Sequence, residues 1–567
     1  MNQPTPAIVA QGAVRRLPRP ALLALCLAYT VAGFIGREPW KGADLAVFGY
    51  MLEMARGATS WLDPQLMGLR PEADGLLPYW LGAWALQAAP PWLPLALAAR
   101  LPFVAMLALT LAASWYAVYY LSRGAGAQPV AFAFGGEAQP TDYARAIADG
   151  GLLALIACLG LAQLSHEVTT HLAQLCFATL VFFAAAAMAT RFFVPGLAMA
   201  MGLAGLILSA APALAMLLGA GSAMAHLLAR DADASGRQRA QRAALAIGLI
   251  TLAAFAMASV LDLWRWRLVL PVELLGRGGR SFGELLLWFC WPAWPLALWT
   301  LWRWRRQIMR RAPSLHLALP IWFAGVAVSA ALITRPADRA LLIALPALAT
   351  LAAFALPTLQ RSVSALIDWF TLLFFSGCAI IIWVIWFALQ TGVPRQPAAN
   401  ALRQAPGFEA VFSLPVFLIA LGATLAWAWL VHWRAGRHRA AIWKSMVLPA
   451  GGATLCWLLL MSLWMPLLDH VRSYAVVMQK IRAVVGPSPC IALLDPSRDQ
   501  IAAFKVDGSF MLEPASDTGR CPWLLVNAKT YGERPARPDP ARWQLQATIR
   551  RPSDKGDEWM LYHQSTP

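Results

Sequence analysis

Long runs of apolar residues recur along most of this chain, and they constrain its fold more than any other feature. Of the 567 residues, 59% are hydrophobic and only 13% are charged, whereas soluble domains carry about 25% charged residues. A helix that crosses a bilayer needs about 20 apolar residues in succession. Because the runs are continuous rather than alternating, they predict a polytopic α-helical membrane protein. They exclude a soluble enzyme, a disordered chain and an outer-membrane β-barrel.

The apolar runs predict an all-α bundle of about 13 transmembrane helices. They cover 20–36, 96–121, 149–165, 172–190, 192–210, 211–229, 243–261, 284–302, 316–334, 339–357, 366–389, 410–432 and 445–466. We therefore expect a membrane domain over 1–466, with a long outside loop over 37–95. The polar remainder, 467–567, is expected to form a small α/β domain outside the membrane.

Basic residues predict the orientation of these helices. Arg15, Arg16 and Arg19 precede the first apolar run, which predicts an uncleaved signal-anchor with a cytoplasmic N-terminus. An odd number of spans then places the C-terminal domain in the periplasm of a bacterial inner-membrane protein. The net charge of +17 is explained by anionic membrane lipids. Because no aromatic–basic interleaving or zinc pattern accompanies it, we expect no nucleic-acid partner.

Two of the eight cysteines, Cys490 and Cys521, lie in the polar C-terminal part. An oxidising periplasm favours a disulfide between them, and two buried free thiols are the alternative. No Cys-x-x-Cys pair occurs, so a cysteine-based zinc or iron–sulfur site is not expected.

The first outside loop places a carboxylate, Asp44, directly before the apolar stretch 45–54. A partly desolvated carboxylate at the lip of a bundle can have a raised pKa and act as a general base. Aspartate is also a preferred N-cap, and a helix is expected to begin at Leu45. Catalysis and helix capping are compatible roles for this residue.

A second polar group, His166, Glu167 and His171, lies in the expected outside turn before the run 172–190. Ionisable residues at the end of a span are candidates for function, although solvated helix caps are the alternative. The two histidines are five residues apart, and a spacing of four would suit one helix face better. A divalent cation at this lip is left open, and no metal ligands are assigned.

Arginines form a third group on the expected outer side. Arg335 and Arg339 flank a tight turn and suit bidentate binding of a phosphate. The alternative is pairing with Asp338 and snorkelling to the interface. Arg265 and Arg267 lie in an outside loop, against the positive-inside rule, and anion binding would explain them.

The order and spacing of these motifs resemble the GT-C membrane glycosyltransferases. Within that group, the motifs resemble those of the bacterial lipid A aminoarabinose transferases and of the protein-mannosyltransferase-like family. The stretches that carry this likeness are Pro39 to Asp44, Leu77 to Leu81, His166 to His171, Trp291 to Pro295, Arg335 to Pro346 and Pro466 to Tyr474. Each motif is short, but together they extend over nearly the whole chain.

The resemblance implies that a sugar is moved from a polyprenyl-phosphate donor to a periplasmic acceptor, with inversion. The acceptor would be a lipid A-like glycolipid, a glycan or a protein. The family's essential carboxylate, proposed as base, corresponds to Asp44, and Glu167 and His171 are the other candidate catalytic residues. The expected substrate-binding residues are Lys41, Asp74, Tyr79, His166, Arg265, Arg267, Arg335 and Arg339.

Two positions depart from the family pattern. Relatives have a second Asp where His171 stands, and Glu167 is the candidate substitute. Relatives also have a Lys shortly before the stretch 77–81, where this chain reads Glu72-Ala73-Asp74-Gly75. A transporter or lipid flippase and a non-catalytic GT-C-like scaffold are the alternative functions. No phosphate-binding loop or dinucleotide fingerprint occurs, and no cofactor is expected with certainty.

Overall fold

The computed structural model describes most of the chain. The described residues are 5–73, 75–229, 234–264, 277–309, 314–334, 336–435, 441–486, 490–508, 510–516, 521–527, 538–551 and 558–564. Four expected substrate-binding residues, Asp74, Arg265, Arg267 and Arg335, lie outside them.

Within this described part, eight helical stretches are long and apolar enough to cross a membrane. Seven are single helices: α4 (Leu95–Ser122), α7 (Thr170–Ala187), α10 (Ala234–Val260), α14 (Leu315–Ile333), α17 (Arg361–Thr391), α19 (Leu414–Ala435) and α20 (Lys444–Leu463). The eighth, Ala337–Thr358, joins α15 (Ala337–Leu341) to α16 (Leu345–Ala355) through short 3-10 turns. The chain is therefore a polytopic α-helical membrane protein, as the apolar runs predict.

Other apolar runs form shorter or broken helices. The helices α11 (Arg277–Phe289) and α12 (Ala293–Arg303) meet at a 91° bend, so they form a broken span or a re-entrant loop. The remaining bundle helices are α1 (Arg19–Val31), α5 (Pro140–Ile156), α6 (Leu159–Leu164), α8 (Phe193–Leu208) and α9 (Pro212–Leu228), and α13 (Arg305–Ile308) follows α12. The number of 13 spans stays a prediction, because several runs yield helices shorter than a bilayer requires.

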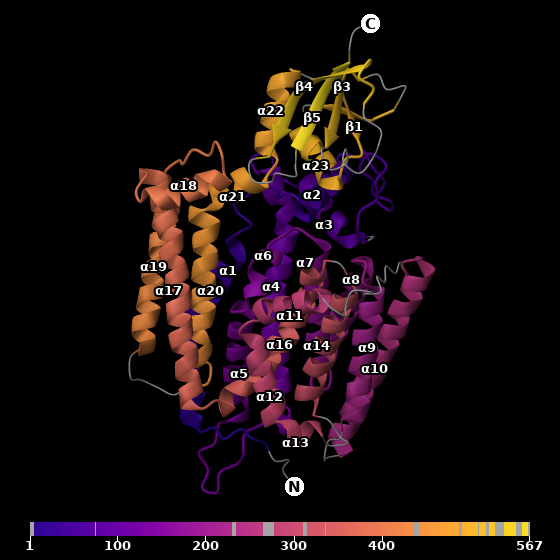
Figure 1. Ribbon diagram of the computed structural model, residues 1–567. Helices are drawn as coiled ribbons and strands as arrows, with labels where there is room; N and C mark the ends of the chain where they lie inside the picture. Colours follow the sequence, from indigo (N-terminus) through magenta and orange to yellow (C-terminus); the bar gives the residue numbers. More distant parts are fainter. Residues whose placement is uncertain are drawn as a thin grey trace.

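The bundle has two flanks around a central group of helices (Figure 1). The helices α17, α19 and α20 pack together at one side, and α8, α9 and α10 pack together at the other. Between them, α4 packs against both α5 and α7. Small residues permit close approach of such helices: a Cβ atom at Gly205 of α8 would lie 2.3 Å from the Phe177 ring of α7.

The chain after α20 forms a small α/β unit. Its helices are α21 (Met465–Arg472), α22 (Ala475–Val485) and α23 (Arg498–Asp507). Its strands are β1 (Cys490–Leu494), β2 (Met511–Pro514), β3 (Trp523–Asn527), β4 (Trp543–Arg550) and β5 (Glu558–Gln564), in the order β2-β1-β3-β5-β4. The strand β1 is parallel to its neighbours β2 and β3, whereas β5 is antiparallel to β3 and β4. The expected fold class is thus confirmed.

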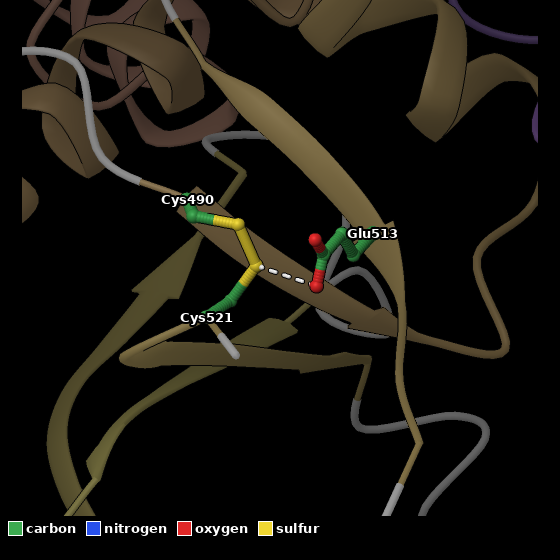
Figure 2. Close-up of side chains that lie close together, drawn as sticks. All are labelled: Cys490, Glu513 and Cys521. Atoms are coloured by element: carbon green, nitrogen blue, oxygen red, sulfur yellow. Dashed lines mark hydrogen bonds between the residues drawn. A yellow bond between two sulfur atoms is a disulfide. The ribbon is translucent and has the colours of Figure 1, made fainter. Parts of the chain in front are cut away.

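A disulfide joins Cys490 and Cys521, whose Cα atoms are 4.9 Å apart. It ties the start of β1 to the residues just before β3, which is the neighbouring strand. Figure 2 shows Glu513 of β2 beside the bridge. The bridge therefore links two neighbouring parallel strands at their starts.

The long loop before α4 is folded rather than irregular. Its apolar stretch forms α2 (Ala43–Ala55), and its second half forms α3 (Leu77–Gln87). Figure 1 shows both helices between the bundle and the C-terminal sheet. The helix α2 packs against α3 and against α23, so the C-terminal unit rests directly on the loop that carries Asp44.

Candidate functional site

The carboxylate of Asp44 lies at the start of α2 and is 3% exposed. Its Oδ1 accepts a hydrogen bond from the backbone N–H of Val168 at 2.8 Å. Its Oδ2 accepts from the Arg37 guanidinium and from the Trp40 N–H, each at 3.0 Å. Arg100 of α4 adds a second cation at 3.8 Å. Asp44 is therefore the centre of a buried network that joins the first loop, α4 and the turn before α7.

The charge state of Asp44 differs from the sequence-based expectation. Burial by itself would raise the pKa of Asp44, but Arg37, Arg100 and the backbone N–H groups of Val168 and Trp40 lower it below its usual value. The expectation of a raised pKa is wrong, because Arg37 from the same loop and Arg100 from α4 accompany the carboxylate into the interior. Asp44 is not the helix cap either, since α2 begins at Ala43 with Gly42 at the N-cap.

The two arginines beside Asp44 were not among the expected site residues. Arg37 is enclosed, with a side-chain exposure of 0%, and it also donates to the His166 carbonyl at 3.0 Å. Arg100 donates to the carbonyls of Phe34 and Arg37. The signal for Arg100 was its position inside the apolar run 96–121, because a charge within a span is costly unless it is paired.

Glu167 and Arg339 form the second ion pair of the site. Glu167 Oε2 accepts from Arg339 Nη2 at 2.9 Å, and its Oε1 accepts from Gln163 Nε2 at 3.2 Å. The Arg339 guanidinium thus contacts Glu167, whereas Asp338 accepts a hydrogen bond from the Arg339 backbone N–H. His171, in the first turn of α7, has a buried Nδ1 without a hydrogen-bond partner among the described residues. The structure thus joins Glu167 and Arg339 across the outer turns of the bundle.

His166 is packed in the interior and is not exposed to a binding site. It is 0% exposed and packs against Phe34 and Trp457, with ring centroids 5.0 and 4.7 Å away. Its ring nitrogens approach the carbonyls of Tyr29 and Ala162. Burial lowers the pKa of His166 to about 4, so the ring is neutral. This arrangement does not support the expected contact with substrate, because neighbouring side chains cover the ring.

The other two expected binding residues belong to the first loop. Tyr79 of α3 is 2% exposed, and its hydroxyl donates to the Ala73 carbonyl at 3.3 Å. The ring of Tyr79 meets Tyr50 of α2 edge-on. Lys41 is partly buried, and its backbone N–H donates to the Arg472 carbonyl at 2.9 Å. Tyr79 thus helps to pack α3 on α2, and Lys41 lies within the chain segment next to Asp44.

A further carboxylate, Asp469 of α21, lies beside the same segment. It accepts hydrogen bonds from the Trp40 indole at 2.7 Å and from the Glu38 N–H at 3.3 Å. Burial raises the pKa of Asp469 to about 6, and the two hydrogen bonds oppose this effect. Its stretch, Pro466 to Tyr474, was part of the family resemblance, but neither Asp469 nor Arg472 was among the expected site residues.

A metal site needs several histidine, cysteine or carboxylate ligand atoms close together. The group whose ligand atoms lie close enough is Cys490, Glu513 and Cys521, in the C-terminal sheet and not at the lip. The two sulfur atoms are bonded to each other, and Glu513 lies 3.3 Å from Cys521 Sγ (Figure 2). In this state neither sulfur is a thiolate, so the group is a disulfide with a neighbouring carboxylate.

The whole architecture was compared with known proteins. No protein-family model matches the sequence, and no curated protein does. ArnT from Cupriavidus metallidurans, in crystal structures bound to undecaprenyl phosphate and in the apo state, matches with a TM-score of 0.58. The match covers 96% of this chain and 97% of ArnT, at 15% identity. The chain has a GT-C fold.

A tethered complex of the Archaeoglobus fulgidus oligosaccharyltransferase with an acceptor peptide is a more distant likeness. Its TM-score is 0.36 at 12% identity, over 77% of this chain and 55% of that protein. The resemblance to GT-C proteins inferred from the motifs is thus confirmed for the fold, through ArnT. Within this GT-C fold, the ion pairs of Asp44 and Glu167 lie at the end of the bundle that faces the C-terminal sheet.

Proposed function

We propose that this chain is a membrane glycosyltransferase that moves a sugar from a polyprenyl-phosphate donor to an acceptor at the outer membrane face. The observation that carries the proposal is the ionised Asp44, buried with Arg37 and Arg100 at one end of a GT-C bundle. The crystal structure of ArnT with undecaprenyl phosphate supports a donor carried on such a lipid.

The proposed reaction needs few groups from the protein. The lipid phosphate is itself the leaving group, so the site must orient an acceptor nucleophile, receive its proton and stabilise the departing charge. A direct displacement inverts the anomeric centre. Asp44 is our candidate for the base, because the family resemblance assigns this role to it and its carboxylate is ionised. It accepts three N–H hydrogen bonds, and a carboxylate has about four acceptor positions.

Arginines are the proposed phosphate ligands. Buried polar atoms are normally hydrogen-bonded, yet Nε and Nη1 of Arg37 and Nε of Arg339 have no partner in the described part of the chain. The Arg339 side chain is 22% exposed, so a phosphate can contact it and gain from its charge. The enclosed Arg37 would act on the phosphate through its charge alone. Arg265, Arg267 and Arg335 remain candidates for the same task, and Glu167 would orient Arg339 while His171 faces the acceptor.

The test uses cells that lack the gene, cells that regain it, and cells that regain the Asp44→Asn or Asp44→Glu variant. Mass spectrometry of envelope lipids, glycans and proteins should show one sugar increment only with the wild type. The increment would identify both the sugar and the acceptor. Each variant must be present at wild-type abundance, and Asp44→Glu keeps the ion pair if Asp44→Asn does not accumulate.

A direct measurement complements the cellular one. The purified protein in nanodiscs should bind undecaprenyl phosphate, and Arg339→Gln should weaken that binding by about tenfold or more. Identical envelope profiles together with absent lipid binding would overturn the proposal. Lipid flux in proteoliposomes without sugar transfer would favour the transporter instead.

A further inference from the structure

The chain segment immediately before Asp44, residues 38–42, is held through its backbone. Pro39 has no N–H group, and each of the other four N–H groups has a partner. The Trp40 N–H donates to Asp44 itself. The other three donate to the C-terminal unit: Glu38 to Asp469 at 3.3 Å, Lys41 to the Arg472 carbonyl at 2.9 Å, and Gly42 to Asp499 at 3.1 Å.

The side chain of Trp40 is held by the same unit. Its indole N–H donates to Asp469 at 2.7 Å. Two guanidinium groups lie against its ring, with the Arg37 carbon 4.5 Å and the Arg472 carbon 4.8 Å from the ring centroid. Such cation–π contacts are strongest where water is excluded, and Trp40 is 3% exposed. The helix α21 therefore covers the loop and brings one of its own cations to it.

The helix α2, which follows the 38–42 segment, is held along its length by α23. Lys505 pairs with the buried Glu53 at 2.9 Å, and the Lys505 carbonyl accepts from Arg56. The backbones approach closely where a Cβ atom at Gly49 would lie 2.5 Å from the Ala502 methyl group. Both ends of α2 are thus fixed to the C-terminal unit.

We infer that α21 and the first turn of α23 hold the 38–42 segment, so that Asp469 and Asp499 are positioning residues for Asp44. The inference rests on the proposed function, because it assigns these residues to the same reaction. Neither carboxylate contacts Asp44 directly. They act through Trp40, whose N–H donates to Asp44, and through Gly42, which is the N-cap of the helix that carries Asp44.

The first experiment measures the segment independently of activity. Hydrogen–deuterium exchange of the full chain in nanodiscs is compared for wild type, Asp469→Ala and Asp499→Ala. Each substitution removes acceptors of the 38–42 amides, so exchange in peptides covering 37–48 should become about tenfold faster. The control is Glu558→Gln, which removes a carboxylate of β5 that pairs with Arg550 at the surface.

Asp469→Asn separates the role of the acceptor from that of the charge. The amide oxygen still accepts from the Trp40 indole, so exchange should stay closer to wild type than in Asp469→Ala. Unchanged exchange in both alanine variants would overturn the inference, whatever the activity of the protein.

The second experiment measures the reaction. In each alanine variant, turnover should fall by about tenfold while the Kd for undecaprenyl phosphate stays within about twofold, because the lipid ligands are not removed. Faster exchange with unchanged turnover would also overturn the inference. If the wild type neither binds undecaprenyl phosphate nor transfers a sugar, the proposed function fails. The exchange data would then show separately whether the C-terminal unit holds the segment.

Discussion

At the scale of single residues, the buried charges of the site depend on one another. Asp44 is enclosed with Arg37 and lies near Arg100, and none of the three is more than 3% exposed in its side chain. Removal of one member of a buried pair leaves an unpaired charge, and this costs far more than the pair contributes. Stability and catalysis at Asp44 must therefore be measured separately.

We expect Asp44→Asn to lower the free energy of unfolding by about 3 kcal/mol, because Arg37 loses its counter-ion. Arg37→Gln should have a comparable effect, and the double variant should cost clearly less than the sum. Thermal unfolding of the purified proteins in one detergent gives all three values. Additive costs would show that the two side chains are not coupled.

Asp469 predicts a pH dependence of stability. Its pKa of about 6 in the fold exceeds the ordinary value of 3.8, so between these values the folded protein binds more protons than the unfolded chain. This group's contribution to the unfolding free energy therefore falls as pH rises from about 4 to 6. Asp469→Asn should stabilise the protein by about 1–2 kcal/mol at pH 7.5, and by less at pH 5. A constant difference in unfolding temperature across this range would contradict the prediction.

At the scale of elements, the contact between α2 and α23 decides how the first loop is held. Gly42, at the start of α2, has φ +93° and ψ −141°, a backbone conformation open almost only to glycine. Seven residues later, Gly49 lets α23 approach. Two glycines of the same helix therefore set its start and its distance from the C-terminal unit.

Gly49→Ala should destabilise the protein by about 1–3 kcal/mol, because the added methyl group overlaps Ala502 and the helices must separate. The matched control is Gly325→Ala in α14, where an added Cβ atom meets nothing within 4 Å. That control should be neutral or slightly stabilising, as alanine favours helices. Equal unfolding temperatures for the two variants would rule out the close contact.

The bridge between Cys490 and Cys521 predicts a redox effect on the C-terminal sheet. The two residues are 31 apart in sequence, and a loop of that size is stabilised by about 3–4 kcal/mol when it is closed by a disulfide. Cys490→Ala should therefore lower the unfolding temperature of the sheet, and reductant should have no further effect on the variant. A wild type insensitive to reductant would contradict this.

At the scale of the whole molecule, the two ends of the chain lie at opposite ends of the bundle, and a cluster of arginines lies near the N-terminal end. Figure 1 shows the N-terminus and the C-terminal sheet at opposite ends of the bundle. Near the N-terminus, Thr5 and Pro6 line a cavity of about 280 Å³ together with Arg303, Arg305 and Arg306. These three arginines therefore lie at the end away from Asp44, and the positive-inside rule associates such a cluster with the cytoplasmic side.

This arrangement predicts a cytoplasmic N-terminus and a periplasmic C-terminal domain over 467–567. Alkaline phosphatase fused after Pro567 should be active in cells, because it folds only outside the cytoplasm. A fluorescent protein fused at the N-terminus should be bright, and the reverse fusions should both fail. Activity of the opposite pair would place the site on the cytoplasmic side.

The sequence alone determined the class of the protein and pointed to the region of the proposed site. Apolar run length is a local property, and the bilayer converts it directly into helices. The motifs around Asp44 and Glu167 also predicted that the outer turns carry the polar groups. Helix breaks within the apolar runs were not predicted, because they depend on packing and not on hydrophobicity.

Only the tertiary structure decided the chemistry of that region. The fold brings Asp469 to Trp40 across 429 residues and Arg100 to the carbonyl of Arg37 across 63. A pKa reflects every charge and donor within a few ångströms. The position of Asp44 alone predicted a raised pKa, whereas Arg37 of the same loop and Arg100 of α4 lower it. Enclosure of a side chain depends on all of its neighbours in space. For this reason His166, polar and at the expected lip, is a packed interior residue, and the loop before Asp44 is fixed by the last part of the chain.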